Sequence, residues 1–178
     1  MGNGEKPGDP DAREASPDAA PVVRSLRRRW TSGVAVGLVG DGAGGFRGIA
    51  LTSFMVVSEE PPLVALAVRI DGEFATFLAD GDAMTVSVLE AAHEFLADRF
   101  SGRAPLPDRA LTGINHQIDD GLPVIAGALA WCRGSVVDIR PAGDHLLVIV
   151  AVAHGEIGPD TDDPLLRYEG RYRRLEAG

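Results

Sequence analysis

Hydrophobic positions recur along the chain with two different periods, and these periods predict its elements. At 84–90 (MTVSVLE) apolar residues alternate with hydroxyl residues, which predicts a strand with one buried face. At 89–100 (LEAAHEFLADRF) apolar residues lie three and four positions apart, which predicts a helix with one apolar face. The residues of that face are Leu89, Ala92, Leu96 and Phe100.

A short amphipathic helix is predicted at 22–30 (VVRSLRRRW), because its apolar residues fall at helical spacing. These apolar residues are Val22 or Val23, Leu26 and Trp30. The arginines Arg24, Arg27 and Arg28 face elsewhere. We interpret them as a solvated helix face, with an anion site as the alternative.

Most of the remaining apolar runs predict strands. The runs 33–39 (GVAVGLV) and 48–62 (GIALTSFMVVSEEPP) flank a glycine-rich turn and predict a hairpin. The second strand is expected to end at its two prolines, since proline has no amide hydrogen to donate, and a strand resumes at 63–69. The segment 101–125 is rich in Gly, Pro and Asp and is interpreted as an irregular loop.

Two long strands, 127–139 and 145–157, are predicted around the turn RPAGD. The expected total is six or seven strands with two or three short helices. Because the strands follow one another without regular intervening helices, we expect a mainly β, antiparallel barrel or sandwich and not a parallel α/β sheet.

Length and charge narrow the class of protein further. The chain has 178 residues and a formal net charge of −9, which argues against nucleic acid as a partner, because nucleic-acid binding needs a basic surface. Residues 1–21 offer little apolar surface to repay ordering, so we predict a disordered tail at 1–21 and one folded domain at 22–178. The sequence has no apolar stretch long enough to span a membrane and no secretory signal, so a cytoplasmic protein is expected.

Searches for catalytic motifs give negative results. The segment HEFLA carries Ala97 where a zinc-protease helix has its second histidine, and PDTDDP lacks the glycine and distal glutamate of a calcium loop. Arg47 stands where a dinucleotide fingerprint has its third glycine. The single Cys132 cannot form an internal disulfide and is expected to be a buried, unreactive thiol. A chain with a core but no such motif either only binds a ligand or takes its chemistry from a cofactor.

Seven segments of the chain, in the order in which the family has them, resemble the flavin reductase-like domain family. The segments are WTSGVAV, GIALTSFMVVSEEPPLVALAV, MTVSVLE, RFSG, GLPVIAGALAWCRG, GDHLLVIV and PLLRYEGRYRRL, and the resemblance as a whole covers residues 24–175. The resemblance implies an FMN-binding, Greek-key split β-barrel and an NAD(P)H:flavin oxidoreductase. Such a protein reduces FMN or FAD with NADH, or less favourably NADPH, and supplies reduced flavin to a partner monooxygenase.

The resemblance also implies two sets of site residues. Short hydroxyls suit a flavin, whose ring edge carries hydrogen-bond acceptors, and an arginine suits its phosphate, for which Arg99 is the expected partner. The flavin contacts of the family correspond here to Thr52, Ser53, Ser58, Ala67, Val68, Arg69, Glu73, Phe74, Arg99 and Phe100. The nicotinamide contacts correspond to Phe46, Arg47, Gly48, Ile49, Ala50, His145, Arg167, Tyr168, Glu169 and Gly170.

Three further expectations follow from the chain. Asp71 and Glu73 stand where many family members carry basic or hydroxyl residues, and an acidic pair would repel a flavin phosphate. The apolar strands 63–68 and 146–153 offer more hydrophobic surface than one small barrel needs, which predicts a homodimer. The alternatives to a reductase are a flavin-binding or carrier protein, or a split-barrel relative that binds another cofactor.

Overall fold

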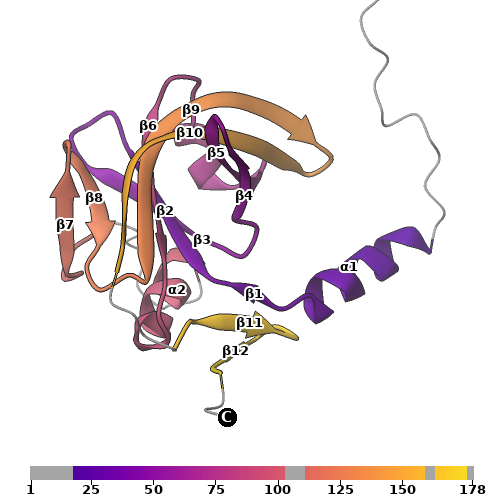
Figure 1. Cartoon of the computed structure of the whole chain (residues 1–178). Helices are drawn as coiled ribbons and strands as arrows, with labels where there is room; N and C mark the ends of the chain where they lie inside the picture. Colours follow the sequence, from indigo (N-terminus) through magenta and orange to yellow (C-terminus); the bar gives the residue numbers. More distant parts are fainter. Residues whose placement is uncertain (1–17, 103–110, 159–162, 176–178) are drawn as a thin grey trace, which may run out of the picture.

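The computed structural model describes residues 18–102, 111–158 and 163–175, which form a mainly antiparallel β structure (Figure 1). Its main sheet has seven strands in the order β3-β2-β6-β9-β10-β5-β4, with every neighbouring pair antiparallel. This arrangement confirms the predicted fold class. The strands are β2 (Ala35–Gly40), β3 (Phe46–Leu51), β4 (Met55–Glu59), β5 (Pro62–Arg69), β6 (Ala83–Val88), β9 (Ala130–Ala142) and β10 (His145–Ile157).

Two small sheets and several short helices surround this main sheet. One small sheet has the order β1-β11-β12 and the other is the β7–β8 hairpin, and both add strands to the six or seven predicted. The small strands are β1 (Ser32–Gly33), β7 (His116–Asp119), β8 (Leu122–Ile125), β11 (Leu166–Tyr168) and β12 (Arg171–Arg173). The helices are α1 (Ala19–Arg29), η2 (Glu73–Phe77), η3 (Ala91–His93) and α2 (Glu94–Phe100). No helix in the described part of the chain is long and apolar enough to cross a bilayer.

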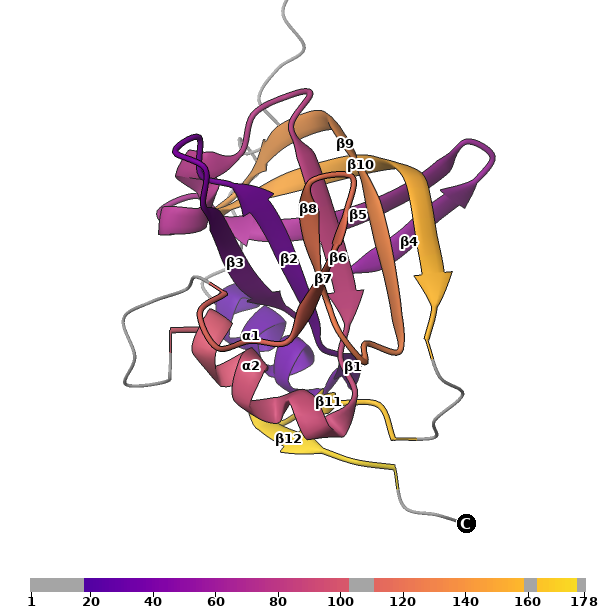
Figure 2. The same cartoon turned by 90° about the vertical axis from the view of Figure 1, so that its left-hand side faces the viewer.

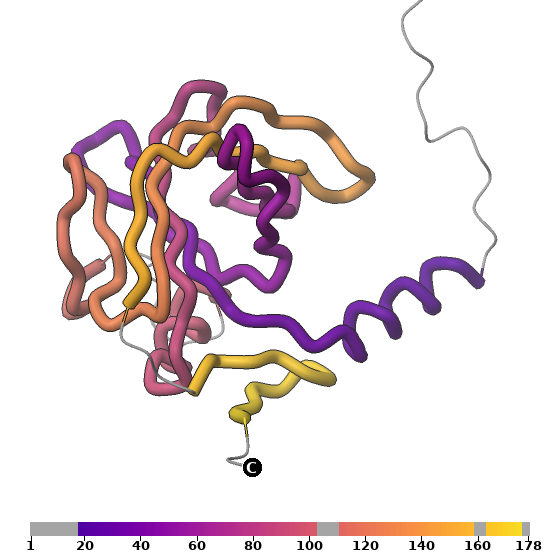
Figure 3. Tube along the Cα trace, viewed as in Figure 1, coloured from indigo at the N-terminus to yellow at the C-terminus, as the bar shows by residue number. Residues whose placement is uncertain are grey.

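The two edge strands of the main sheet, β3 and β4, follow one another in the sequence. The single strand predicted at 48–62 is therefore wrong, because the chain leaves the sheet at Thr52 and re-enters it on the opposite edge at Met55. The trace in Figure 3 shows the sheet curling round so that these two edges face each other across a split. The residues between β3 and β4 bridge the split.

The core lies in two layers on either side of β2. One layer, inside the curled sheet, contains the buried side chains of β5, β6 and β10 together with Ala35 and Val39. The other contains Val36 and Leu38 and is covered by α2, which lies across the ends of β2 and β3 (Figure 2). Strand β2 is buried on both faces for this reason, and its pattern in the sequence is a continuous apolar run.

Strand β6 lies where the sequence predicted a strand. One buried face was predicted, but both faces of the strand are buried. Thr85 and Ser87 are both fully buried, although their side chains alternate with the apolar ones. Their hydroxyls bond to strand β8: Thr85 Oγ1 donates to the carbonyl of Pro123 at 2.6 Å, and Ser87 Oγ accepts from the amide of Ile125 at 3.1 Å. A buried hydroxyl is tolerated when it is hydrogen-bonded in this way.

The β7–β8 hairpin lies within 101–125, where an irregular loop was predicted. Residues 103–110 of this segment lie outside the described residues. Asp119 pairs with Leu122, so the turn consists of only Asp120 and Gly121, with φ angles of 47° and 80°. A two-residue turn with both residues in the left-handed region matches the twist of the flanking strands and favours Asp-Gly. The pair DG was therefore a hairpin signal in the sequence.

Helix α2 ends at Phe100 as predicted, but its buried face differs from the predicted one. Leu96, Ala97 and Phe100 are buried, whereas Ala92 is exposed and lies in the short helix η3. The chain turns between the two helices at His93, so a single helical wheel over 89–100 does not apply.

Helix α1 confirms the predicted amphipathic helix and projects away from the sheet in Figure 1. It begins at Ala19, inside the predicted tail, because Pro21 occupies the first turn, where an amide has no helical acceptor to lose. The rest of the predicted tail, residues 1–17, lies outside the described residues. No residue of α1 is buried.

Candidate functional site

A cavity of about 410 Å³ lies at the split between the two edges of the main sheet. Its walls come from the end of β3, the bridging residues Thr52 and Ser53, the end of β5, and the last turn of α2. The lining residues are Arg27, Ile49, Ala50, Leu51, Thr52, Ser53, Ala67, Val68, Arg69, Gly72, Phe74, Phe100, Ser101 and His145. The cavity is therefore apolar on several sides, with polar groups from separate elements at its edge.

Ser53 ties the split together with its side chain. Strand β4 pairs Met55 with Ala65, so Ser53, two residues earlier, lies opposite Ala67. There the chain has left the ladder, and the Ser53 hydroxyl donates to the Ala67 carbonyl at 3.0 Å and accepts from its amide at 3.1 Å. The hydroxyl thus replaces the missing strand pairing. Thr52 is exposed, and its hydroxyl has no hydrogen-bond partner among the described residues.

A charged network forms the rim of the cavity at the ends of β5 and β10. Arg69 donates to both oxygens of Asp71, at 2.8 and 2.7 Å, and lies 3.7 Å from Asp144. His145 Nδ1 is 2.7 Å from the Asp144 carboxylate. Because a carboxylate only accepts, Nδ1 carries the proton, and Nε2 has no partner in the described part of the chain.

The same contacts keep the rim carboxylates ionised. The hydrogen bond from Arg69 lowers the pKa of Asp71, and the hydrogen bond from His145 lowers the pKa of Asp144. A carboxyl with a depressed pKa contributes stability above its unfolded value and loses it as the pH falls. The network is therefore intact at neutral pH, and Asp71 neutralises Arg69 instead of lying free against the cavity.

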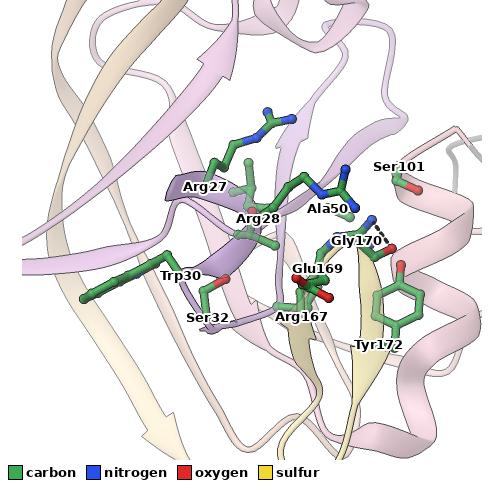
Figure 4. Close-up of a pocket in the computed structure, with 13 residues that line it drawn as sticks. Arg27, Arg28, Trp30, Ser32, Ala50, Ser101, Arg167, Glu169, Gly170 and Tyr172 are labelled. Carbon is green, nitrogen blue, oxygen red and sulfur yellow. Dashed lines mark hydrogen bonds between the residues drawn. The ribbon is translucent and has the colours of Figure 1, made fainter. Parts of the chain in front are cut away.

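A second cavity of about 220 Å³ adjoins the first and shares Arg27, Ala50, Leu51, Thr52 and Ser101 with it. It lies between the end of α1 and the β11–β12 hairpin (Figure 4). The remaining lining residues are Arg28, Trp30, Ser32, Val34, Arg167, Glu169, Gly170 and Tyr172. The two cavities are therefore neighbours, and together they extend from the split of the sheet to α1.

Seven of the residues predicted to contact a flavin line the first cavity, and three do not. Ser58 lines a different, apolar cavity on the far side of the β4–β5 hairpin. Glu73 is exposed at the start of η2, and Arg99 donates to the carbonyl of Thr112 at 3.0 Å. The structure therefore does not bring the expected phosphate partner Arg99 to this cavity. The seven lining residues are Thr52, Ser53, Ala67, Val68, Arg69, Phe74 and Phe100.

The residues predicted to contact nicotinamide divide in a similar way. Ile49 and His145 line the first cavity, Ala50 lines both, and Arg167, Glu169 and Gly170 line the second. The remaining four, Phe46, Arg47, Gly48 and Tyr168, line neither cavity.

Two of these four have structural roles. Arg47 pairs with Asp41 at 3.2 Å and lies over the Phe77 ring. A Cβ at Gly48 would lie 2.4 Å from Phe100 Cε1, so a glycine is needed there to admit the Phe100 ring. Gly48 corresponds to a nicotinamide contact of the family, and its close neighbour in this structure is a core side chain.

Sequence reasoning missed the contribution of α1 and of the chain that follows it. Arg27, Arg28, Trp30 and Ser32 all line the joined cavities. The three consecutive arginines were visible in the sequence, but the direction of a helix face depends on where the helix docks. The amide of Glu169 donates to the Arg28 carbonyl at 2.7 Å, and this contact joins the end of α1 to the β11–β12 turn.

The family model "Flavin reductase like domain" matches residues 27–176. The chain belongs to this family. The resemblance found in the sequence is thereby confirmed. The matched range contains every strand of the main sheet and the residues that line both cavities.

Curated members of the flavin reductase family include close relatives of this chain. An NADH:FMN oxidoreductase from Rhodococcus qingshengii is 33% identical over 156 residues, which cover 85% of this chain and 79% of the relative. The reductase component of 4-hydroxyphenylacetate 3-monooxygenase from Thermus thermophilus is 36% identical over 129 residues, with 72% and 79% covered.

Solved structures of flavin reductases match the fold over nearly their whole length. An NADH:FAD oxidoreductase from Streptomyces globisporus, in complex with NAD and FAD fragments, has a TM-score of 0.79 and 29% identity, covering 93% of this chain and 98% of that one. The styrene monooxygenase flavin reductase from Pseudomonas putida S12 has a TM-score of 0.75 and 28% identity, with 87% and 98% covered.

Replacing Ser53 should destabilise the protein, whereas the neighbouring hydroxyl should be dispensable for folding. Ser53→Ala leaves the half-buried amide and carbonyl of Ala67 without these partners, and a lost hydrogen bond typically costs about 0.5–1.5 kcal/mol, so the loss of two should cost about 1–3 kcal/mol. Thr52→Val removes a hydroxyl that bonds to nothing in the described chain, so it should change the free energy of unfolding by less than about 0.5 kcal/mol. Urea denaturation followed by circular dichroism measures both. Equal losses in the two variants would contradict the role given to Ser53.

Proposed function

We propose that this protein is an NADH-dependent flavin reductase that supplies reduced FMN or FAD to a partner monooxygenase. The observation that carries the proposal is the pair of adjoining cavities at the split of the sheet, which have room for ligands and are lined by most of the residues expected from the family. Family membership and relatives named as NADH:FMN oxidoreductase and monooxygenase reductase component support the same activity.

The lining of the cavity fits a flavin ring. Ala50, Val68 and Phe74 offer apolar contact, and the unbonded Thr52 hydroxyl offers a hydrogen bond to a polar ring edge. A bound flavin supplies a hydride acceptor, which the side chains of this protein do not. The task of the chain is then to hold two ring systems in register, since hydride transfer needs orientation more than acid or base groups.

His145 is suited to orient the nicotinamide. Its ring lies at the cavity rim with 29% of the side chain exposed, and Asp144 fixes its Nδ1. This leaves Nε2 able to accept a hydrogen bond from a carboxamide N–H. Asp144 also contacts Arg69, so the imidazole is held from the ends of two strands, β5 and β10.

The proposed activity has a direct test. The purified protein should bind FMN or FAD and oxidise NADH when flavin is added, with a higher kcat/KM for NADH than for NADPH. Glu169 in the second cavity would repel the additional 2′-phosphate of NADPH. Absorbance at 340 nm follows the reaction. Flavin binding without NADH oxidation would indicate a carrier, and the absence of both would favour another cofactor.

His145→Ala should lower flavin reduction without weakening flavin binding. One positioned hydrogen bond or ring contact is worth roughly 1–3 kcal/mol, so kcat/KM for NADH should fall by about 10- to 100-fold. Flavin affinity should stay within about threefold, because a residue that contacts only the second substrate makes no differential contact with the first. Stopped-flow reduction of bound flavin measures the effect. An unchanged rate and NADH dependence would remove His145 from the nicotinamide site.

A homodimer is the second part of the proposal, and its support differs from the sequence argument. No large apolar side chain of 63–68 or 146–153 is strongly exposed, so these strands do not provide the excess surface expected of them. Two groups of neighbouring exposed apolar side chains lie instead on α1 and on β4. Those on α1 and at its end are Val22, Val23, Leu26 and Trp30, which are 56, 63, 62 and 77% exposed.

Helix α1 needs a partner to be stable. It has 11 residues and buries none of them, and isolated helices of fewer than about 12–15 residues are marginal in water. The β4 strand has a second exposed apolar surface: Met55 and Val56 are 54% and 68% exposed, and Val56 lines an apolar cavity with Trp131 and Ile157. We propose that two copies cover these surfaces for each other in a C2 dimer, because a two-fold interface can pair two different patches reciprocally.

A charged residue introduced on the apolar surface of α1 or of β4 should dissociate the proposed dimer. The wild-type protein should sediment at about twice the chain mass of 18.7 kDa, and Leu26→Glu or Val56→Glu should shift it toward the monomer at micromolar concentration. Arg24→Gln, on the polar side of the same helix, is the matched control and should remain dimeric. A wild-type monomer in sedimentation velocity would contradict the proposed dimer.

A further inference from the structure

The amphipathic helix α1 does not turn its apolar face toward its own domain. A surface helix normally turns its apolar face to the core and its charged face to solvent. Here Val22, Val23 and Leu26 are exposed, whereas Arg27 and Arg28 line the cavities. In Figure 4 both arginine side chains extend to the side of Ser101, and Trp30 extends the other way. The charged face of α1 is therefore directed at the candidate site.

The joined cavities carry an excess of positive charge in an acidic protein. Four arginines line them, and Glu169 is the single carboxylate among the described lining residues, although the chain has a net charge of −9. A concave surface of one sign concentrates ligands of the opposite sign. The four arginines are Arg27, Arg28, Arg69 and Arg167.

These four arginines differ in the partners that they already have. Arg69 is held in a two-point contact with Asp71. Arg167 donates to the carbonyl of Gly170 at 3.0 Å and lies over the Tyr172 ring. Arg27 and Arg28 form no ion pair or side-chain hydrogen bond with any described residue. Their guanidinium groups are thus the ones left to bind a ligand.

A backbone hydrogen bond holds the end of α1, which carries these two arginines, beside the cavities. The end of α1 is joined to the β11–β12 turn by the hydrogen bond from the Glu169 amide to the Arg28 carbonyl. Arg27 lines both cavities, so it lies where they meet, beside Thr52 and Ser101. A cation at this junction can reach a charged group attached to a ligand whose ring occupies the first cavity.

We propose that Arg27 and Arg28 form a phosphate-binding site for the nucleotide ligands of the reductase, in place of Arg99. Guanidinium groups bind phosphate oxygens in pairs, and both flavin nucleotides and NADH carry phosphate next to the part that reacts. This inference rests on the proposed function. All three arginines of the predicted solvated face are exposed, as expected, but only Arg24 lies outside both cavities, so the alternative of an anion site applies to Arg27 and Arg28.

Calorimetric titration with three ligands tests the site without turnover. FMN and riboflavin share the flavin ring and differ in the phosphate, whereas ADP-ribose carries the diphosphate of NADH without nicotinamide. The variants are Arg27→Gln with Arg28→Gln as a double change, and Arg24→Gln as the control on the same helix. Charge-assisted bonds are the strong ones, so the double variant should lose about 10- to 100-fold in affinity for a phosphate ligand. Riboflavin affinity should stay within about twofold.

Each outcome has a defined meaning. Loss of FMN affinity alone supports a site for the flavin phosphate, and loss of ADP-ribose affinity alone supports a site for the NADH diphosphate. The proposal would be overturned if the double variant kept its affinity for both ligands, or if Arg24→Gln lost as much affinity as the double variant. It would also be overturned if the wild-type protein bound neither ligand. A wild-type protein that binds these ligands through the two arginines but does not oxidise NADH would keep the phosphate site and refute the reductase. Thermal melting of each variant checks that it is folded.

Discussion

The candidate site depends on how the chain crosses between the two edges of an incompletely closed sheet. Strands β3 and β4 are the edges, and the chain passes from one to the other within residues 52–54. Backbone pairing with β5 stops there, and the Ser53 hydroxyl supplies the missing donor and acceptor to Ala67. Because this hydroxyl holds the crossing in place, the split stays open beside it and Thr52 is exposed at the cavity.

Part of the walls of the two cavities comes from elements that are not part of the main sheet. The last turn of α2 reaches it because Phe100 packs against Gly48 of β3, and the β11–β12 turn reaches it by holding the end of α1. A sheet with a packed interior has no room for a ligand, so the site lies at its edge. Hydride transfer suits such a site, since it requires two rings held in place and no buried acid or base.

The sequence predicted the elements better than their surroundings. Periodicity located the long strands and both α-helices, since each has its own pattern of apolar residues. It could not show that Thr85 and Ser87 are buried, because their partners lie in a distant hairpin at Pro123 and Ile125. The turn residues Asp120 and Gly121 did carry a local signal, which the polar composition of the surrounding segment obscured.

The candidate site shows the same limit. Positions near the ends of β3 and β5 could be carried over from the family because they belong to the sheet itself. Arg99 and Ser58 were carried over from the family as well, and the structure places one beside Thr112 and the other at a separate cavity. Conversely, Arg27 and Arg28 enter the site through the docking of α1, which depends on a contact with Glu169, about 140 residues away in the sequence.

Helix α1 connects the two proposals made for this protein. It buries no residue on its own chain, yet one of its faces is apolar and exposed and the other directs arginines into the joined cavities. A second copy covering the apolar face and a phosphate bound to the arginine face would stabilise the same short helix. Two ligands that stabilise one marginal element favour each other's binding, and this coupling is reciprocal. Dimer formation and nucleotide binding would then be linked through α1, although the two surfaces share no residue.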